Sequence, residues 1–164
     1  TPVLFLLNGG ITNFEKGMEC RFSDVNAPDG IFFVTDGEMS IKGCDIANNL
    51  SFKDMVVGKG SKLLFKDMSI SENSSIGGDI IDTASGSDLT MKNVKITSNV
   101  PGRSILELNQ SSAKFIKVEF ESNSYRSDRA QVSYKNLSVF FGFYVFYKYP
   151  TGLDFVSVRY GQNR

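Results

Sequence analysis

The chain has 164 residues, and its 18 basic and 18 acidic side chains cancel, so charge gives no reason to expect nucleic acid or an acidic membrane as a partner. It contains no His, which removes the commonest general base and a common zinc ligand. No apolar run approaches the roughly 20 residues of a membrane-spanning helix. The length suits one domain covering residues 1–164.

One spacing of apolar residues recurs along the chain. Segment 89–99 has Leu89, Met91, Val94 and Ile96 at its first, third, sixth and eighth positions, and Asn99 closes it at the eleventh. These are two alternating pairs separated by a slip of one residue. Full copies of the pattern begin at Met39, Leu63, Leu89, Ala113 and Leu153. A partial copy has Cys20 and Phe22 as its second pair and Val25 in the Asn place. A further copy, Val132, Tyr134, Leu137 and Val139, has Gly142 in the Asn place.

The period of these copies points to a solenoid. The first four full copies are spaced by 24, 26 and 24 residues, and the next steps, to Val132 and Leu153, are 19 and 21 residues. Periods in this range are typical of repeats that stack to build a core. The slip is expected to be a corner, where two neighbouring residues both face outward and the inward alternation restarts.

A further apolar segment precedes most copies, which gives three short strands per repeat. Ile31 and Phe33 lie eight and six residues before Met39, and Met55 and Val57 lie at the same offsets before Leu63. Ile81, Ile105 and Val145 occupy the first of these places in later copies. We therefore predict an all-β, single-stranded right-handed parallel β-helix of about six to seven coils, each of roughly 19–26 residues. The alternative is an antiparallel β-sandwich.

Two columns of equivalent residues concern the corners. The Asn column is expected to supply a left-handed corner and a ladder of side-chain hydrogen bonds between coils. It contains Asn49, Asn73, Asn99, Asn123 and Asn163. The Lys column marks the outward corner, either as a solvated flank, which we favour, or as a cationic stripe for acidic glycans. It contains Lys42, Lys66, Lys92 and Lys135, with Ile116 interrupting it.

Four Asn residues begin glycosylation sequons, which fits a secreted or surface protein. Asn49 and Asn73 belong to the expected ladder, which would oppose a glycan. Asn109 and Asn136 fall in an expected loop and an outward corner. These two are the better candidates for glycosylation.

Cys20 and Cys44 fall in one inward column on adjacent coils. They are near enough for a disulfide, but parallel neighbours in register seldom offer the right torsion, so we expect two buried free thiols. The same column is expected to continue through Met68, Val94, Val118, Leu137 and Val158.

The densest aromatic run covers residues 140–149. We expect it to form the third strand of the last coil with Val145 inside, and the alternative is a binding face for a partner or for sugar rings. The side chains of that candidate face are Phe140, Phe141, Phe143, Tyr144 and Phe146.

No catalytic constellation stands out, and no cofactor or metal motif is present in the sequence. The nearest approximation to the outward acids and basic residue of a carbohydrate-active β-helix is the set Asp79, Asp82, Arg103 and Glu107.

Residues 77–80 are Gly-Gly-Asp-Ile, and residues 120–123 are Phe-Glu-Ser-Asn. The first segment resembles the GGA[ILV] motif, and the second matches the FxxN motif, of the chlamydial polymorphic outer-membrane proteins. Ile46, Ile70, Ile96 and Tyr160 begin variants of FxxN with another residue in the Phe place. The likeness extends from about Gly37 to Asn163. The same motifs also occur in the wider pectin-lyase-like group of proteins. It implies a secreted or surface-exposed, adhesin-like or fibre-forming β-helix, and it carries over no catalytic residue.

These observations favour a non-enzymatic extracellular or cell-surface structural or adhesive module, and the alternative is a polysaccharide lyase or hydrolase. The expected partners are other copies of the chain, surface or matrix proteins, or glycans. The last copy of the pattern ends at Asn163, so we also expect a fragment of a longer solenoid or a unit that stacks end to end.

Overall fold

The structure is a computed structural model that describes residues 4–15, 20–124, 132–135 and 139–148, the last two segments by their backbone alone. Its elements are all strands: β1 (Phe5–Asn8), β2 (Ile11–Glu15), β3 (Arg21–Ser23), β4 (Phe32–Thr35), β5 (Glu38–Lys42), β6 (Asp45–Ala47), β7 (Leu50–Ser51), β8 (Val56–Lys59), β9 (Lys62–Ser71), β10 (Ser74–Ser75), β11 (Ile81–Ala84), β12 (Asp88–Thr97), β13 (Leu106–Asn109), β14 (Ser112–Glu121), β15 (Val132–Lys135) and β16 (Val139–Lys148).

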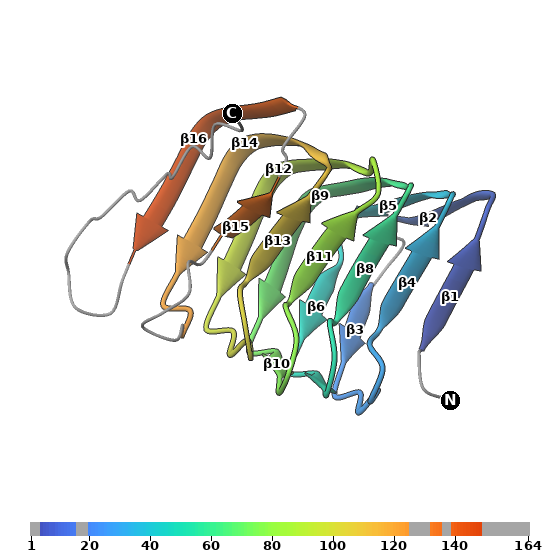
Figure 1. Cartoon of the computed structure of the whole chain (residues 1–164). Coiled ribbons are helices and arrows are strands. Elements are labelled where there is room, and N and C mark those ends of the chain that lie inside the picture. Colours follow the sequence, from blue (N-terminus) through green and yellow to red (C-terminus); the bar gives the residue numbers. More distant parts are fainter. Residues whose placement is uncertain (1–3, 16–19, 125–131, 136–138, 149–164) are drawn as a thin grey trace.

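The strands wind into a parallel β-solenoid (Figure 1). One six-stranded sheet has the order β1-β4-β8-β11-β13-β15, and a second has the order β16-β14-β12-β9-β5-β2. Figure 1 shows the long strands of the second sheet curving over the top of the first. The pairings recorded between described strands are all parallel, which excludes the antiparallel sandwich. Within the described residues, the six strands of the first sheet correspond to about five turns. The last of the six to seven coils expected from the sequence begins at Leu153, outside those residues.

Equivalent residues of successive coils lie directly opposite one another. Ile46 pairs with Ile70, Ile70 with Ile96, and Ile96 with Phe120. All four side chains are fully buried. The stacking that the repeat predicts is therefore confirmed, and it builds a single continuous apolar core.

In β9, β12 and β14, the slip in the repeat is a bend inside one continuous strand. In β9, Lys66 and Asp67 both face outward, while Phe65 and Met68 on either side are buried. Asp67 has a left-handed backbone with φ of 52°, and the hydrogen-bonded ladder resumes beyond it. The residues at this bend in the other coils are Gly43, Asn93 and Lys117, which also have positive φ. The expected corner is present. At Gly43 it separates β5 from β6, whereas it does not interrupt β9, β12 or β14.

The inward positions of the third strand differ by one residue from the prediction in β4. Ile31 is buried as expected, but Phe32 and Val34 fill the interior and Phe33 faces outward beneath the Lys59 ammonium, 5.2 Å from its ring centroid. Phe32 packs edge to face against aromatic rings of the first coil. Because Phe32 and Phe33 are both apolar, the sequence pattern alone does not tell which of them faces the core.

The sequence prediction for the coil after β14 is wrong. Val132 pairs with Leu106 of β13, so β15 belongs to the first sheet and does not start a copy of the long strand. The long strand is β16, which includes the aromatic run and pairs Phe140 with Ala113 and Val145 with Val118. The aromatic run is thus not a third strand, and Val145, not Leu137, continues the cysteine column. The step from Ala113 to Phe140 is 27 residues, whereas the prediction had 19.

That error has a simple cause. The apolar spacing of Val132, Tyr134 and Val139 imitates the pattern of the long strand, although these residues belong to two different sheets. Lys135 correspondingly lies opposite Asn109, so it is not part of the Lys column. The copy beginning at Leu153, with its Asn163, lies outside the described residues.

Candidate functional site

A disulfide joins the first two coils. Cys20 and Cys44 are bonded, with their Cα atoms 4.6 Å apart, so the expectation of free thiols is wrong. This Cα separation falls within the range that disulfides occupy. Both cysteines lie one residue ahead of the paired strands β3 and β6.

The Asn column forms a buried ladder of hydrogen bonds through four coils. The Nδ2 atom of Asn49 donates to Oδ1 of Asn73 at 2.9 Å, Asn73 donates in the same way to Asn99 at 3.0 Å, and Asn99 to Asn123 at 3.0 Å. Each acceptor oxygen also receives the backbone N–H of the preceding Asn. In the first coil, the N–H of Val25 donates to Asn49, so the backbone contact persists where the Asn is missing.

The left-handed residue of this corner is not the ladder Asn itself. Positive φ is found one residue earlier, at Asn48, Glu72, Ser98 and Ser122. The residue before the Asn makes the turn, and the Asn then points inward. This arrangement corrects the expected conformational role of the column.

The sequons fall into two structural groups. Asn49 and Asn73 are 2% and 0% exposed and are held by the ladder, so their amides are not available for a glycan in the folded chain. Asn109 is the last residue of β13 and is half-buried. The Oγ of the buried Ser111 donates to the Asn109 carbonyl oxygen at 3.0 Å. Asn136 lies outside the described residues.

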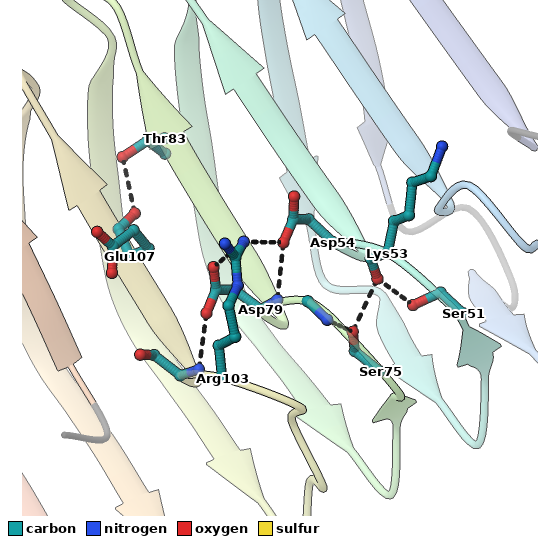
Figure 2. A network of polar contacts seen from close by, with 10 residues as sticks. Ser51, Lys53, Asp54, Ser75, Asp79, Thr83, Arg103 and Glu107 are labelled. Carbon is teal, nitrogen blue, oxygen red and sulfur yellow. Dashed lines mark hydrogen bonds and ion pairs between the residues drawn. The ribbon is translucent and has the colours of Figure 1, made fainter. Parts of the chain in front are cut away.

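A network of charged side chains crosses three coils at the turn that leads into the first sheet (Figure 2). The Arg103 guanidinium lies between Asp54 and Asp79, and its Nη2 atom is 2.7 Å from Asp54 Oδ1 and 2.8 Å from Asp79 Oδ2. The other oxygen of Asp79 accepts the backbone N–H of Ser104 at 2.6 Å. Asp54 in turn accepts the backbone N–H of Asp79 at 2.8 Å.

The network uses side-chain and main-chain groups together. The hydroxyls of Ser51 and Ser75 both donate to the carbonyl oxygen of Lys53, and Ser75 accepts the N–H of Gly78 (Figure 2). These contacts fix the turn from which Asp79 projects. Asp54 was missed by the sequence reasoning, although its position 25 residues before Asp79 is the available signal.

Two carboxyl groups here titrate above their usual range. Burial raises the pKa of Asp79 to about 7, opposed by the Ser104 N–H and by Arg103. Burial also raises the pKa of Asp82 to about 6, and the charges of Asp54 and Glu107 act in the same direction. Asp82 of β11 lies opposite Glu107 of β13 in the sheet register. The structure thus brings together the four residues suggested by the sequence, with Asp54 added.

The other two candidate surfaces are only partly placed. Lys42, Lys66 and Lys92 follow one another across β5, β9 and β12, and Ile116 comes next. Lys42 pairs with Glu15 at 2.8 Å, and Lys66 lies 3.7 Å from Asp67. The aromatic face falls on β16, whose side chains are outside the described part of the structure.

The described residues contain no helix that is both long and apolar enough to cross a membrane. Within the same residues, no group of three or more His, Cys, Asp or Glu side chains is arranged to hold a metal ion.

Comparison with known proteins adds one finding. A family model described as "right handed beta helix region" matches residues 4–145, which is more than half of the chain. No curated protein and no solved structure matches the chain. The match agrees with the parallel stacking seen in the structure and supplies the handedness. The chain therefore belongs to the right-handed β-helix family.

Proposed function

We propose that this chain is a non-enzymatic structural or adhesive β-helix module that works outside the cell or at its surface. The observation that carries the proposal is the use of the charged network between coils. Arg103 bridges Asp54 and Asp79, and the Asp79 side chain is only 1% exposed. These ion pairs join three successive coils, which supports a structural role for the charged groups.

The disulfide supports an extracellular location. Disulfides persist in oxidising compartments and are rare in the cytosol, so Cys20–Cys44 fits a secreted or surface protein. The ladder of Asn side chains and the disulfide both stabilise a rigid rod, which suits a protein that presents a surface to a partner.

The proposal is tested by binding. The purified, oxidised chain is assayed for attachment to cultured cells, to extracellular matrix proteins, to a glycan array and to itself, with the reduced and unfolded chain as control. We expect saturable binding to at least one of these that is lost on unfolding. Absence of binding in all four arms would refute the adhesive role, and electron microscopy of the native material would show whether the rods join into fibres.

One observation favours a second candidate, a carbohydrate-active enzyme. Asp82 and Glu107 lie on neighbouring strands, which are separated by about 4.8 Å, and the pKa of Asp82 is raised to about 6. A proton donor beside a carboxylate is the arrangement that glycosidases use. Turnover of polygalacturonate that is abolished by Asp82→Asn would replace the first proposal with this one.

A further inference from the structure

The two sequons in the Asn ladder use both of their defining residues to build the coil. In residues 49–51 and 73–75, the Asn side chain is a rung of the ladder, and the side chain of the Ser two positions later is buried. Figure 2 shows the hydroxyls of Ser51 and Ser75 donating to one carbonyl oxygen, that of Lys53, at 2.7 and 2.8 Å. The turn of the solenoid therefore accounts for the Asn-x-Ser spacing in both places.

In both rungs, each hydrogen of the side-chain amide is already used. The Nδ2 atom of Asn73 donates to Ile46 O at 2.9 Å and to Asn99 Oδ1 at 3.0 Å. The Nδ2 atom of Asn49 likewise donates to Phe22 O and to Asn73 Oδ1, both at 2.9 Å. A side-chain amide has two hydrogens to donate, so neither rung has one to spare.

N-glycosylation removes one of these hydrogens. The amide nitrogen bonds to C1 of a sugar carried on a polyprenyl pyrophosphate, the bond from C1 to the pyrophosphate oxygen breaks, and the nitrogen gives up one proton. Modified Asn73 would keep one hydrogen for two acceptors and would place a sugar ring where the residue is 0% exposed. Asn49, which is 2% exposed, meets the same conflict. A glycan on either residue is therefore incompatible with the folded ladder.

The conflict arises when the sugar is attached before folding. In the unfolded chain both sequons are ordinary acceptors, whereas the folded coil hides the Asn amide and the Ser hydroxyl together. Ser51 and Ser75 are 0% and 1% exposed. The later rungs escape this competition, because neither Asn99 nor Asn123 has a Ser or Thr two positions later.

Asn109 begins a sequon without these restrictions. It follows the buried Leu108 in the alternation of β13, so its side chain points away from the core. Within the described part of the chain, its side-chain amide makes no hydrogen bond. A glycan at this position would leave the ladder intact.

We propose that Asn49 and Asn73 form a folding trap: N-glycosylation of either residue in the unfolded chain blocks the solenoid, whereas a glycan on Asn109 is tolerated. Productive folding then requires that the second and third coils bury their sequons before an oligosaccharyltransferase reaches them. Since disulfides form in oxidising compartments, the trap acts where such a compartment also attaches N-glycans. This inference concerns the folding step and does not depend on the adhesive role.

The first test follows glycan occupancy through refolding. The full chain is expressed in yeast behind a secretion leader, all of it is extracted in urea with reductant, and its glycans are trimmed to a single N-acetylglucosamine. The pool is refolded with oxidation, and the protease-resistant protein is compared with the starting pool by mass spectrometry. We expect occupancy at Asn49 and Asn73 to fall at least tenfold in the resistant fraction, and occupancy at Asn109 to change less than twofold.

The second test removes one sequon and compares two hosts. In Ser51→Ala the Asn49 rung is kept, and the Lys53 carbonyl oxygen still accepts from Ser75. We expect the yield of native, secreted protein to rise at least twofold in yeast, because Asn49 is no longer an acceptor. In a bacterial host that attaches no N-glycans, the same variant should yield no more native protein than the parent chain. An unchanged yield in yeast would overturn the trap at Asn49.

Ser111→Ala is the matched control, since it removes the Asn109 sequon together with a buried hydroxyl, and it should raise the yield in neither host. Protease-resistant, oxidised protein that carries a sugar at Asn49 or Asn73 overturns the proposal. A yeast pool in which neither residue is occupied also overturns it, because the transferase then never meets the unfolded sequons. An equal loss of Asn109 occupancy on refolding overturns it as well, since the ladder would then not be the cause.

Discussion

Replacing Asn73 by Val tests whether the Asn ladder stabilises the solenoid. The Asn73 side chain takes part in four buried hydrogen bonds, accepting from the backbone N–H and Nδ2 of Asn49 and donating to Ile46 O and Asn99 Oδ1. The substitution leaves two buried donors of Asn49 unpaired, at about 1–3 kcal/mol each. Burying the Val side chain offsets part of this cost, so we expect a loss of about 3 kcal/mol. That is a substantial share of the roughly 5–15 kcal/mol typical of a domain.

The assay is urea unfolding followed by far-ultraviolet circular dichroism, on protein from a bacterial host so that loss of the Asn73 sequon has no effect. Asn13→Val is the matched control, since Asn13 is exposed on β2 and the same exchange there should change the free energy of unfolding by less than about 0.5 kcal/mol. A loss below about 1 kcal/mol for Asn73→Val would mean that the ladder follows the coil geometry without stabilising it.

Three further predictions concern the charged network, the disulfide and a tight turn. The pKa of Asp82 is raised to about 6, so its contribution to stability is present below its unfolded pKa near 4 and is lost as the pH rises through 6. Asp82→Asn should therefore raise the free energy of unfolding at pH 8, by on the order of 1 kcal/mol, and change it little at pH 4. Equal effects at both pH values would contradict the assignment. Replacing Cys20 and Cys44 together by Ala opens a loop with a sequence separation of 24 residues and should lower the free energy of unfolding by about 3 kcal/mol in urea titrations, a loss that reductant should reproduce in the parent chain and not in the variant. A Cβ atom on Gly102 would lie 2.3 Å from the Ile76 carbonyl oxygen, so Gly102→Ala should cost about 1–3 kcal/mol by thermal unfolding, and an unchanged melting temperature would show that this turn shifts freely.

The stacked columns were predictable because each inward position must match the residue above and below it. Ile46, Ile70 and Ile96 recur for that reason, and their alignment in the structure confirms the parallel arrangement. The bend between the apolar pairs was predictable too, since two adjacent polar residues such as Lys66 and Asp67 interrupt the inward alternation.

The remaining features depend on information that apolar spacing does not contain. Val132 has the spacing of a long strand but pairs with Leu106 of the first sheet, so only the length of the preceding connection separates the two interpretations. The contact between Arg103 and Asp54 joins residues 49 positions apart, across an intervening coil. A reading that compares each coil with the next one does not detect a contact of that range.

The direction of the Asn hydrogen bonds constrains how such a rod can vary in length. Each amide oxygen serves the N–H and Nδ2 groups of the coil before it, and the first coil keeps the N–H contact through Val25. A whole repeat can therefore be duplicated or deleted with every donor meeting an equivalent acceptor. Steps of 24 and 26 residues between successive Asn residues keep the same rung, so the turns absorb small insertions that a strand could not. Growth of this architecture in evolution should thus proceed in complete units of one turn.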